Sequence, residues 1–388
     1  MLTRRTFVQT VGTGVAAYIG ARGRENSLWA AFEPTLEAVE PGVICLSSNE
    51  NPGGPGKTVL EAIHTAFGPK GARPGRYDGT SGPLIDAIAK RNGVKPENVV
   101  LGCGSTQILR SCTHLFTAKD KALVGTIPTY EECAGYAEMM GHPVRPVALD
   151  ANFKIDLDKF ADAAKGAGLV FYCNPNNPTA TYVGARATRE FLAKLAKDSP
   201  DTYVLVDEAY YDYVTDPDHD THIPVAVDNP HVIVARTFSK AYGMAGLRMG
   251  YAIGHTETIK KMRDWDAGAG TSSLNVLAMQ AGLAAIQQDP SFITAERARN
   301  KEVRDFTMKW FADRGMQPTD SQANFMFVNI GRPVKEFREA CARQKVKVAR
   351  DFPPFEKTHC RISYGTMDEM KRAVAVFGEV FAKKTTAA

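Results

Sequence analysis

Polar residues that could hold a phosphate group follow a short apolar run at residues 98–103. Gly104, Ser105 and Thr106 come directly after this run and open a predicted helix. Backbone N–H groups at the start of a helix carry partial positive charge, and the two hydroxyl groups can donate further hydrogen bonds. A glycine–serine helix start is also a common cap, so this segment alone indicates an anion site without establishing one.

Three further apolar runs are each followed by residues that could do chemistry. Asp207 ends one run, where apolar surroundings make a carboxylate costly unless a cation pairs with it. Asn177 lies in an Asn-Pro-Asn-Asn-Pro turn after a second run, and Lys240 follows a third, with Arg248 eight residues later. Each has an ordinary explanation, such as a helix cap for Asp207 or a surface charge for Lys240. Their shared position after strands predicts one site, because open parallel sheets bind ligands beyond the carboxyl ends of their strands.

The apolar runs are short and bounded by turn residues, which predicts buried strands. Helical patterns lie between several of them, at residues 84–91, 106–116 and 187–197. Strands that alternate with helices predict an α/β fold with a mostly parallel sheet covered by helices. The predicted strands occupy residues 98–103, 122–126, 144–149, 169–174, 202–207, 231–236 and 249–254.

The sequence predicts a large domain and a smaller one. Residues 61–290 hold all of these runs and form the predicted large domain. In residues 291–388, a long amphipathic stretch from 292 to 314 leads to two strand-like segments, which predicts a small C-terminal domain. Residues 32–60 are rich in proline and glycine and are expected to form an N-terminal arm that packs on the small domain.

Together and in this order, the motifs resemble those of the class I/II aminotransferases of pyridoxal phosphate fold type I, and most closely the histidinol-phosphate aminotransferases. The resemblance runs from Leu46 to Phe377. It implies a mostly parallel seven-stranded sheet in a large domain plus a smaller α+β domain. It also implies an enzyme that moves an amino group between an amino acid or amine and a 2-oxo acid by a ping-pong mechanism. The motifs are NENPGGP, GRYDG, GCGSTQ, PTYEE, NPNNPT, VDEAYYD, TFSKAYGMAGLRMGY and CRISYGTMDEM.

The resemblance implies pyridoxal 5'-phosphate as the cofactor and a role for each matching residue. Lys240 would form a Schiff base with it and then carry protons, which requires an amine that can be neutral. Asp207 would pair with the pyridine nitrogen, while Tyr210 and Asn177 would hydrogen-bond the phenolic oxygen. Lys240, Asp207 and Tyr210 are thus the expected catalytic residues. Other cofactor contacts are expected from Gly104, Ser105, Thr106, Tyr130, Thr237, Ser239 and Arg248, and from Tyr77 of the partner subunit.

The resemblance also implies a substrate site. Arg361 would grip the substrate carboxylate in a bidentate fork, Arg350 suits an anionic group on the substrate, and Asn51 completes the expected substrate contacts. The expected partners are a small amino donor, a 2-oxo acid acceptor and a second copy of the chain, in a homodimer with shared active sites. Gly53 and Ala180 depart from the family pattern, which often has an aromatic residue and a glycine there.

Two interpretations with the same cofactor remain open. A decarboxylase or lyase acting on a small phosphorylated amino acid would use the same residues, because the cofactor stabilises a carbanion from any bond to Cα. A non-catalytic protein that binds the cofactor or amines would need a fused partner domain, and the sequence shows no sign of one.

Motifs of other classes are incomplete. A dinucleotide-binding loop would need a glycine where Gln107 stands, and a nucleotide P-loop around Lys57 would need one at Asn51. His219 and His222 lie among aspartates and are interpreted as a polar surface loop, so no metal is expected.

Residues 1–31 resemble a twin-arginine export signal. Arg4 and Arg5 precede a weakly apolar run at 11–21 that is too short to span a bilayer. We expect a cleaved signal, a periplasmic enzyme and no membrane anchor after processing; a chance arginine pair in a cytoplasmic protein is the alternative. Four arginines and one glutamate give this segment +3 of the net +4, so the remaining +1 (4 − 3) indicates no nucleic-acid surface. The 7 cysteines are an odd number without a Cys-x-x-Cys pair, which predicts buried thiols.

Overall fold

The computed structural model describes residues 41–67, 75, 81–268 and 274–382. Met1–Val43 form a unit of their own, so the description that follows concerns Ile44–Ala388. The predicted export signal at 1–31 and Tyr77 lie outside the described residues. In the described ranges, no helix is both long and apolar enough to cross a membrane.

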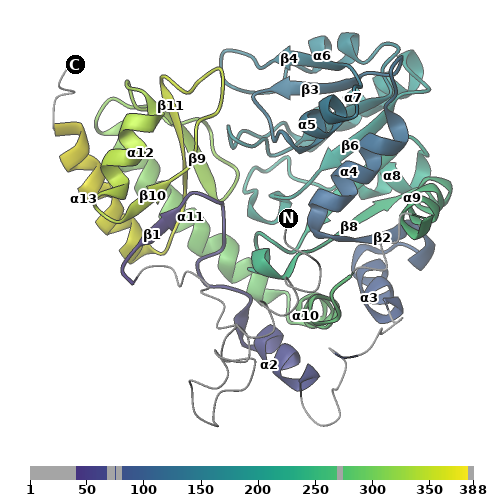
Figure 1. Ribbon diagram of the computed structural model, residues 1–388, viewed down its shortest axis with the longest axis horizontal. Coiled ribbons are helices and arrows are strands. Elements are labelled where there is room, and N and C mark those ends of the chain that lie inside the picture. Colours follow the sequence, from purple (N-terminus) through teal and green to yellow (C-terminus); the bar gives the residue numbers. More distant parts are fainter. Residues whose placement is uncertain (1–40, 68–74, 76–80, 269–273, 383–388) are drawn as a thin grey trace, which may run out of the picture. The chain divides into compact units, whose positions relative to one another are not determined.

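A seven-stranded sheet forms the centre of the larger part of the structure, as predicted (Figure 1). All of its neighbouring strands run parallel except β8, which is antiparallel to both β2 and β7. Each strand falls within one or two residues of a predicted run, because the apolar side chains fill both faces of a buried sheet. In spatial order the strands are β2 (Val99–Cys103), β8 (Met249–Gly254), β7 (Val232–Thr237), β6 (Tyr203–Asp207), β5 (Leu169–Cys173), β3 (Leu123–Ile127) and β4 (Val144–Ala148).

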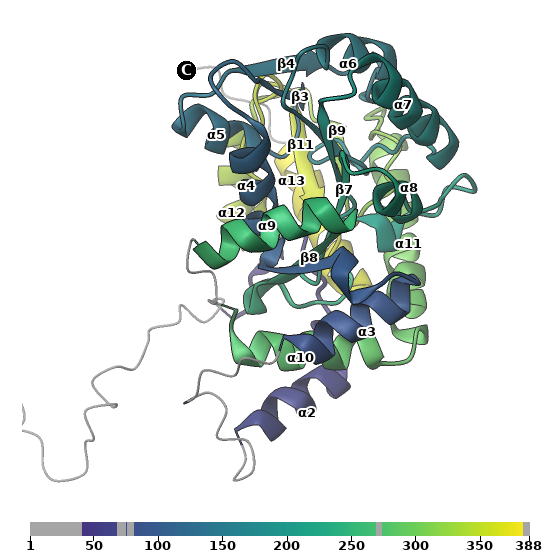
Figure 2. The same ribbon diagram turned by 90° about the vertical axis from the view of Figure 1, so that its right-hand side faces the viewer.

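Helices cover both faces of this sheet (Figure 2). Alternate residues of one strand point to opposite faces, as Phe171 and Tyr172 of β5 do. One face packs against α4 (Gly104–Phe116), α5 (Glu132–Met139) and α9 (Thr256–Gly268). The other face packs against α3 (Gly82–Asn92), α6 (Leu157–Ala163), α7 (Ala185–Asp198), α8 (Ile223–Asp228) and α10 (Val276–Gln287).

A second hydrophobic core lies in the C-terminal part and contains two small sheets. The predicted amphipathic stretch forms one long helix, α11, and the two strand-like segments form the antiparallel pair β9 and β11. The elements are α11 (Ser291–Ala312), β9 (Phe325–Asn329), α12 (Val334–Ala342), β10 (Val346–Val348), β11 (His359–Ser363) and α13 (Met367–Ala382).

The segment that precedes the large sheet in sequence reaches both cores. β1 (Ile44–Leu46) pairs in parallel with β10, and its two buried residues join the C-terminal core. α2 (Gly56–Ala66) packs instead on α10, through Val59. Between β1 and α2 the chain crosses the carboxyl-end side of the large sheet, where it meets the loop after β7. The described residues also contain three short 3-10 helices: η3 (Pro96–Asn98), η4 (Tyr211–Tyr213) and η5 (Ala245–Leu247).

Candidate active site

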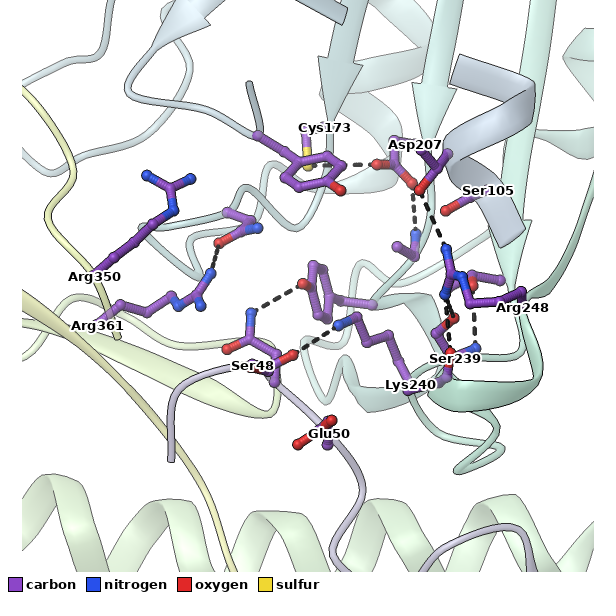
Figure 3. A pocket seen from close by; sticks show the side chains of 18 residues that line it. Ser48, Glu50, Ser105, Cys173, Asp207, Ser239, Lys240, Arg248, Arg350 and Arg361 are labelled. Carbon is purple, nitrogen blue, oxygen red and sulfur yellow. Dashed lines mark hydrogen bonds between the residues drawn. The ribbon is translucent and has the colours of Figure 1, made fainter. Parts of the chain in front are cut away.

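A cavity of about 310 Å³ lies at the carboxyl ends of β5, β6 and β7, where the predicted chemistry converges (Figure 3). Its walls come from the large sheet, from the segment between β1 and α2, and from the C-terminal core. The lining residues are Ser48, Asn49, Glu50, Ser105, Thr106, Tyr130, Cys173, Asn177, Asp207, Ala209, Tyr210, Thr237, Ser239, Lys240, Ala245, Arg248, Arg350 and Arg361.

Arg248 and three hydroxyl-bearing side chains form an anion cradle at one end of the cavity. The Arg248 guanidinium donates to Thr106 Oγ1 and to Ser239 Oγ, each at 3.4 Å. The Ser239 N–H donates to Thr237 Oγ1 at 3.1 Å. Gly104 lies beneath the guanidinium with φ of +67°, and a Cβ there would stand 2.5 Å from Arg248 Nη2. Glycine is therefore required at the start of α4 for the arginine to reach the cradle.

Asp207 lies at the end of β6 and is 3% exposed. Burial raises its pKa to about 6, although the Ala209 N–H donates to it at 3.1 Å and Lys240 favours its charged form. The Cys173 thiol also lies 3.9 Å from the carboxylate. A buried carboxylate with this pKa is prepared to pair with a cationic group of a ligand.

Lys240 follows β7, and its ammonium donates to the Ser48 carbonyl oxygen at 3.1 Å. Its Nζ also lies 5.6 Å from the centre of the Tyr210 ring. Burial lowers the pKa of Lys240 to about 8, and Arg361 adds to the lowering, while Glu50 and Asp207 oppose it. A minor fraction of this amine is therefore neutral near pH 7, far more than for an ordinary lysine, and the neutral form is the one that a nucleophile requires.

Arg361 projects from β11 towards the cavity and is 8% exposed. Its Nη1 donates to Asn177 Oδ1 at 2.7 Å, and its Nη2 donates to the Ser47 carbonyl oxygen. Its Nε is buried and has no hydrogen-bond partner among the described residues. Because a buried unpaired N–H is costly, this atom marks a place for an anionic group of a ligand.

The structure does not bring Asn51 to the cavity. Its Nδ2 donates to the Ala241 carbonyl oxygen at 3.0 Å, and its Oδ1 accepts from the Gly53 N–H at 2.8 Å. Nearby, a Cβ on Gly243 would lie 2.1 Å from the Gly54 carbonyl oxygen. Asn51 therefore fastens this segment to the loop that carries Lys240, in place of the substrate contact that the sequence suggested.

Sequence reasoning missed Asn49, which lines the cavity two residues earlier. Asn49 Nδ2 donates to the Tyr210 hydroxyl at 3.0 Å, and its Oδ1 accepts from Ser363 Oγ at 2.8 Å. It thereby ties the large sheet to the C-terminal core beside Arg361. Ser48, Glu50 and Cys173 also line the cavity and were not predicted. The Asn-Glu-Asn triplet was the available signal, and its first asparagine faces the cavity.

The other predicted residues are placed as follows. Tyr130 and Arg350 line the cavity, and the Arg350 guanidinium forms an ion pair with Glu131. His222 is buried, with its Nδ1 3.1 Å from Glu208 Oε1, so the interpretation of a surface loop is wrong for this histidine. Glu208 also binds Arg236, and the pair anchors the chain directly after Asp207.

Comparisons with known proteins agree with this geometry. Residues 41–377 match the family described as aminotransferase class I and II. A histidinol-phosphate aminotransferase of Moorella thermoacetica is 34% identical over 88% of this chain and 86% of its own length. A solved structure from Erwinia carotovora atroseptica is 29% identical, with a TM-score of 0.80 over 87% of this chain and 95% of its own. A histidinol-phosphate aminotransferase of Sinorhizobium meliloti, solved in complex with pyridoxal-5'-phosphate, is 26% identical, with a TM-score of 0.77 over 87% and 91%.

The fold and the cavity together define an enzyme of pyridoxal phosphate fold type I, in which a lysine, a buried acid and an anion cradle share one pocket. The chain belongs to the class I and II aminotransferase family and is a pyridoxal-phosphate-dependent aminotransferase. The residues present fit that cofactor. The cradle around Arg248 suits a phosphate, the raised pKa of Asp207 suits a cationic ring nitrogen, and Lys240 lies within the same cavity.

Proposed function

We propose that the amino donor places an anionic group on Arg361 and its amine beside Lys240, and that a 2-oxo acid then takes up the amino group. The observation that carries this proposal is the unpaired Nε of the buried Arg361. A carboxylate or a phosphate would satisfy that N–H with a charge-assisted hydrogen bond. The donor is thus an amino acid or an amine with an anionic tail, like histidinol phosphate, the compound in the names of relatives.

Side chains on three sides would hold the cofactor. When bound, pyridoxal phosphate supplies the ring that takes up electrons released at the reacting carbon of the substrate. Arg248 and the neighbouring hydroxyl groups would hold the phosphate, and Asp207 would keep the ring nitrogen protonated. Tyr130, Tyr210 and Asn177 also line the cavity. Tyr130 would contact the ring, and Tyr210 with Asn177 would hydrogen-bond its phenolic oxygen.

Lys240 would perform the proton transfer. Its pKa of about 8 leaves a neutral amine that can bind the cofactor covalently and, once released, accept a proton from the substrate carbon. The Ser48 carbonyl oxygen holds Nζ in the cavity, and the Asn51 contact holds the loop around it. Both contacts keep the amine at the carboxyl ends of the strands, where the cavity lies.

The experiment that tests this function is a donor screen on purified enzyme with added pyridoxal phosphate. Histidinol phosphate and a set of amino acids are offered with 2-oxoglutarate, and glutamate formation is measured. We expect turnover with at least one donor that stops when the 2-oxo acid is omitted. Release of carbon dioxide without an acceptor would instead support the decarboxylase interpretation.

Asp207 also gives a prediction on stability and pH. Its folded-state pKa of about 6 lies above the ordinary value of 3.8, so the folded protein binds this proton more tightly than the unfolded chain. The free energy of unfolding of the cofactor-free protein should therefore fall as pH rises from about 4 through about 6, by on the order of 3 kcal/mol. Asp207→Asn has no carboxyl group to titrate at this position. Its free energy of unfolding, relative to that of the unchanged protein, should therefore rise by about 1 kcal/mol between pH 5 and pH 8.

Urea unfolding of the cofactor-free proteins at these two pH values measures the effect. Asp201→Asn, at an exposed position, supplies the baseline for removing a carboxylate. If the difference in free energy of unfolding between Asp207→Asn and the unchanged protein is the same at both pH values, Asp207 titrates at its ordinary pKa in the folded protein.

We propose, further, that residues 1–31 direct the enzyme to the periplasm by the twin-arginine route. The support is the Arg4-Arg5 pair followed by a short, weakly apolar run. Export in the folded state would let the protein take up its cofactor before leaving the cytoplasm. Replacing both arginines by lysine should leave the protein in the cytoplasmic fraction, and unchanged periplasmic recovery would refute this route.

We also propose a homodimer in which Tyr77 of the partner subunit reaches the phosphate of the cofactor. The family resemblance supports the shared site, and four large apolar side chains are exposed in the described part of the chain: Leu60, Phe67, Ile127 and Met139. Sedimentation of the full-length chain, which has a mass of 42.2 kDa, should give twice the mass of one chain. A monomer that is fully active would refute the proposal.

A further inference from the structure

Asn49 connects Tyr210 to the C-terminal core through hydrogen bonds among buried side chains. Its Nδ2 lies 3.0 Å from the Tyr210 hydroxyl oxygen, and its Oδ1 lies 2.8 Å from Ser363 Oγ. Asn49, Tyr210 and Ser363 are 1%, 4% and 2% exposed. Buried polar groups need hydrogen-bond partners, so the direction of each of these hydrogen bonds follows from the partners that are within reach.

Ser363 fixes the direction in which the Asn49 amide points. The backbone N–H of Asn49 lies 2.9 Å from Ser363 Oγ, and a backbone N–H can only donate. The Ser363 hydroxyl therefore accepts from this N–H and has its one hydrogen left for Asn49 Oδ1. If the amide were turned round, Nδ2 would face Ser363 Oγ, and the serine hydrogen would have no acceptor among the described residues. Asn49 thus presents an N–H donor to Tyr210, and the pairing of β11 with β9 holds Ser363 in place.

The hydroxyl group of Tyr210 is left with a free hydrogen. Its oxygen accepts from Asn49, and the described part of the chain offers no acceptor for its hydrogen, although Tyr210 lines the cavity. Burial raises the pKa of Tyr210, Arg361 and Asn49 oppose this, and Asp207 adds to it, so the hydroxyl keeps its hydrogen near neutral pH. The remaining charged neighbour, Lys240, lies 5.6 Å from the centre of the ring. The result is an O–H donor that is available to a ligand in the cavity.

We propose that Asn49 is a positioning residue that makes Tyr210 a hydrogen-bond donor to the phenolic oxygen of the cofactor. By donating to the Tyr210 oxygen, Asn49 leaves the hydroxyl hydrogen for the ligand and strengthens it as a donor. A donor at the phenolic oxygen stabilises the negative charge there, so the nearby Schiff-base nitrogen loses its proton more easily. This inference rests on the proposed function, because it takes from it the contact between Tyr210 and the phenolic oxygen.

The pKa of the Schiff base in the holoenzyme tests the proposal, and it is read from the visible absorbance band of the bound cofactor over a pH series. Asn49→Asp replaces the amide donor by an oxygen that accepts the Tyr210 hydrogen, and aspartate tolerates the left-handed backbone at this position. We expect this pKa to rise by about one unit, the order expected when one hydrogen bond to a charged oxygen is lost. Asn49→Gly removes the donor without adding a charge, and it should raise the pKa by a smaller amount.

The Tyr210→Phe background shows whether Asn49 acts through Tyr210. Tyr210→Phe alone should raise the pKa of the Schiff base, because it removes the donor itself. The carboxylate added by Asn49→Asp has an electrostatic field of its own, and that contribution would remain in the Tyr210→Phe background. We expect both Asn49 variants to shift the pKa clearly less in this background than with Tyr210 in place. Shifts of equal size in the two backgrounds, or the absence of a shift in both Asn49 variants, would overturn the proposal.

Asn324→Ser is the matched control for the packing of the segment. Asn324 Nδ2 donates to the Asn49 carbonyl oxygen at 2.9 Å, so this variant loosens the same residue and leaves the direction of its side-chain amide unchanged. We expect a lower temperature of unfolding and an unchanged pKa of the Schiff base. A pKa shift as large as that of Asn49→Asp would show that the position of the segment matters, and the role assigned to the Asn49 amide would be wrong.

The absorbance titration needs neither an amino donor nor a 2-oxo acid, so it separates this inference from the proposed function. Failure of every donor, with the pKa shifts present as expected, would refute the proposed amino transfer alone. Turnover of a donor by an enzyme whose Schiff-base pKa does not respond to the Asn49 variants would refute the role of Asn49 alone.

Discussion

Replacing Lys240 by alanine should lower the rate of transamination at least about a thousandfold, within the range lost when a general acid–base is removed. Lys240 is the only lysine among the residues that line the described cavity, so no neighbour can take over its task. The substitution removes both the covalent attachment of the cofactor and the proton carrier. Cofactor binding should weaken without disappearing, because the cradle around Arg248 and the carboxylate of Asp207 remain.

Two further variants make the Lys240 result specific. Lys240→Arg keeps the positive charge but is never neutral at ordinary pH, so it should be as inactive as the alanine variant. Lys57→Ala, at an exposed ion pair with Glu61, should retain full activity. Turnover is measured by glutamate formation, and attachment by the visible absorbance band with added cofactor. Substantial turnover by Lys240→Ala would contradict the assignment.

The sequence predicts the strand-end residues of the site well because of the geometry of parallel strands. Asp207 ends an apolar strand of the large sheet, Asn177 and Lys240 follow two others, and the structure brings all three to one cavity. Buried strands are recognisable from short apolar runs, and a parallel sheet leaves their carboxyl ends at one edge. Local sequence was therefore sufficient for this half of the site.

The contacts between distant segments could not be predicted in the same way. Arg361 binds Asn177 across 184 positions of the chain, and Asn49 binds Tyr210 across 161. Whether Asn49 or Asn51 faces the cavity depends on how the segment after β1 crosses the Lys240 loop. Asn49 has a left-handed backbone conformation, with φ of +56°, which changes the direction of the chain at this residue. Such a conformation leaves little trace in the sequence, since asparagine tolerates it without requiring it.

Ala180 shows how a departure from the family pattern is accommodated. It adopts φ of +61°, a conformation that glycine adopts more readily, and it is fully buried. The Ala180 N–H donates to the Asn176 carbonyl oxygen at 2.7 Å, which closes the turn. The turn keeps Asn177 in the cavity wall, as the sequence suggested. The left-handed conformation of Ala180 is unfavourable because its Cβ lies close to the following carbonyl oxygen.

Replacing Asp207 by asparagine should lower kcat by about a hundredfold to a thousandfold, the loss typical when one preorganised charged group is removed. Asparagine has nearly the same shape, but it cannot keep a proton on the ring nitrogen of the cofactor. The negative charge that develops at the reacting carbon is then poorly stabilised, whereas Arg361, the residue proposed to bind the donor, is unchanged. KM for the donor should therefore change only a few-fold, and the affinity for the cofactor should fall much less than kcat.

Asp207→Glu keeps the charge and supplies the contrast to Asp207→Asn. If the negative charge is what matters, Asp207→Glu should recover part of the kcat that Asp207→Asn loses. The carboxylate is kept, although the longer side chain places it farther from the end of β6. Steady-state rates at several pH values, with cofactor affinity measured separately, distinguish this electrostatic role from a packing role. A packing role would instead lower cofactor affinity and kcat together, with the glutamate variant as impaired as the asparagine variant or more so.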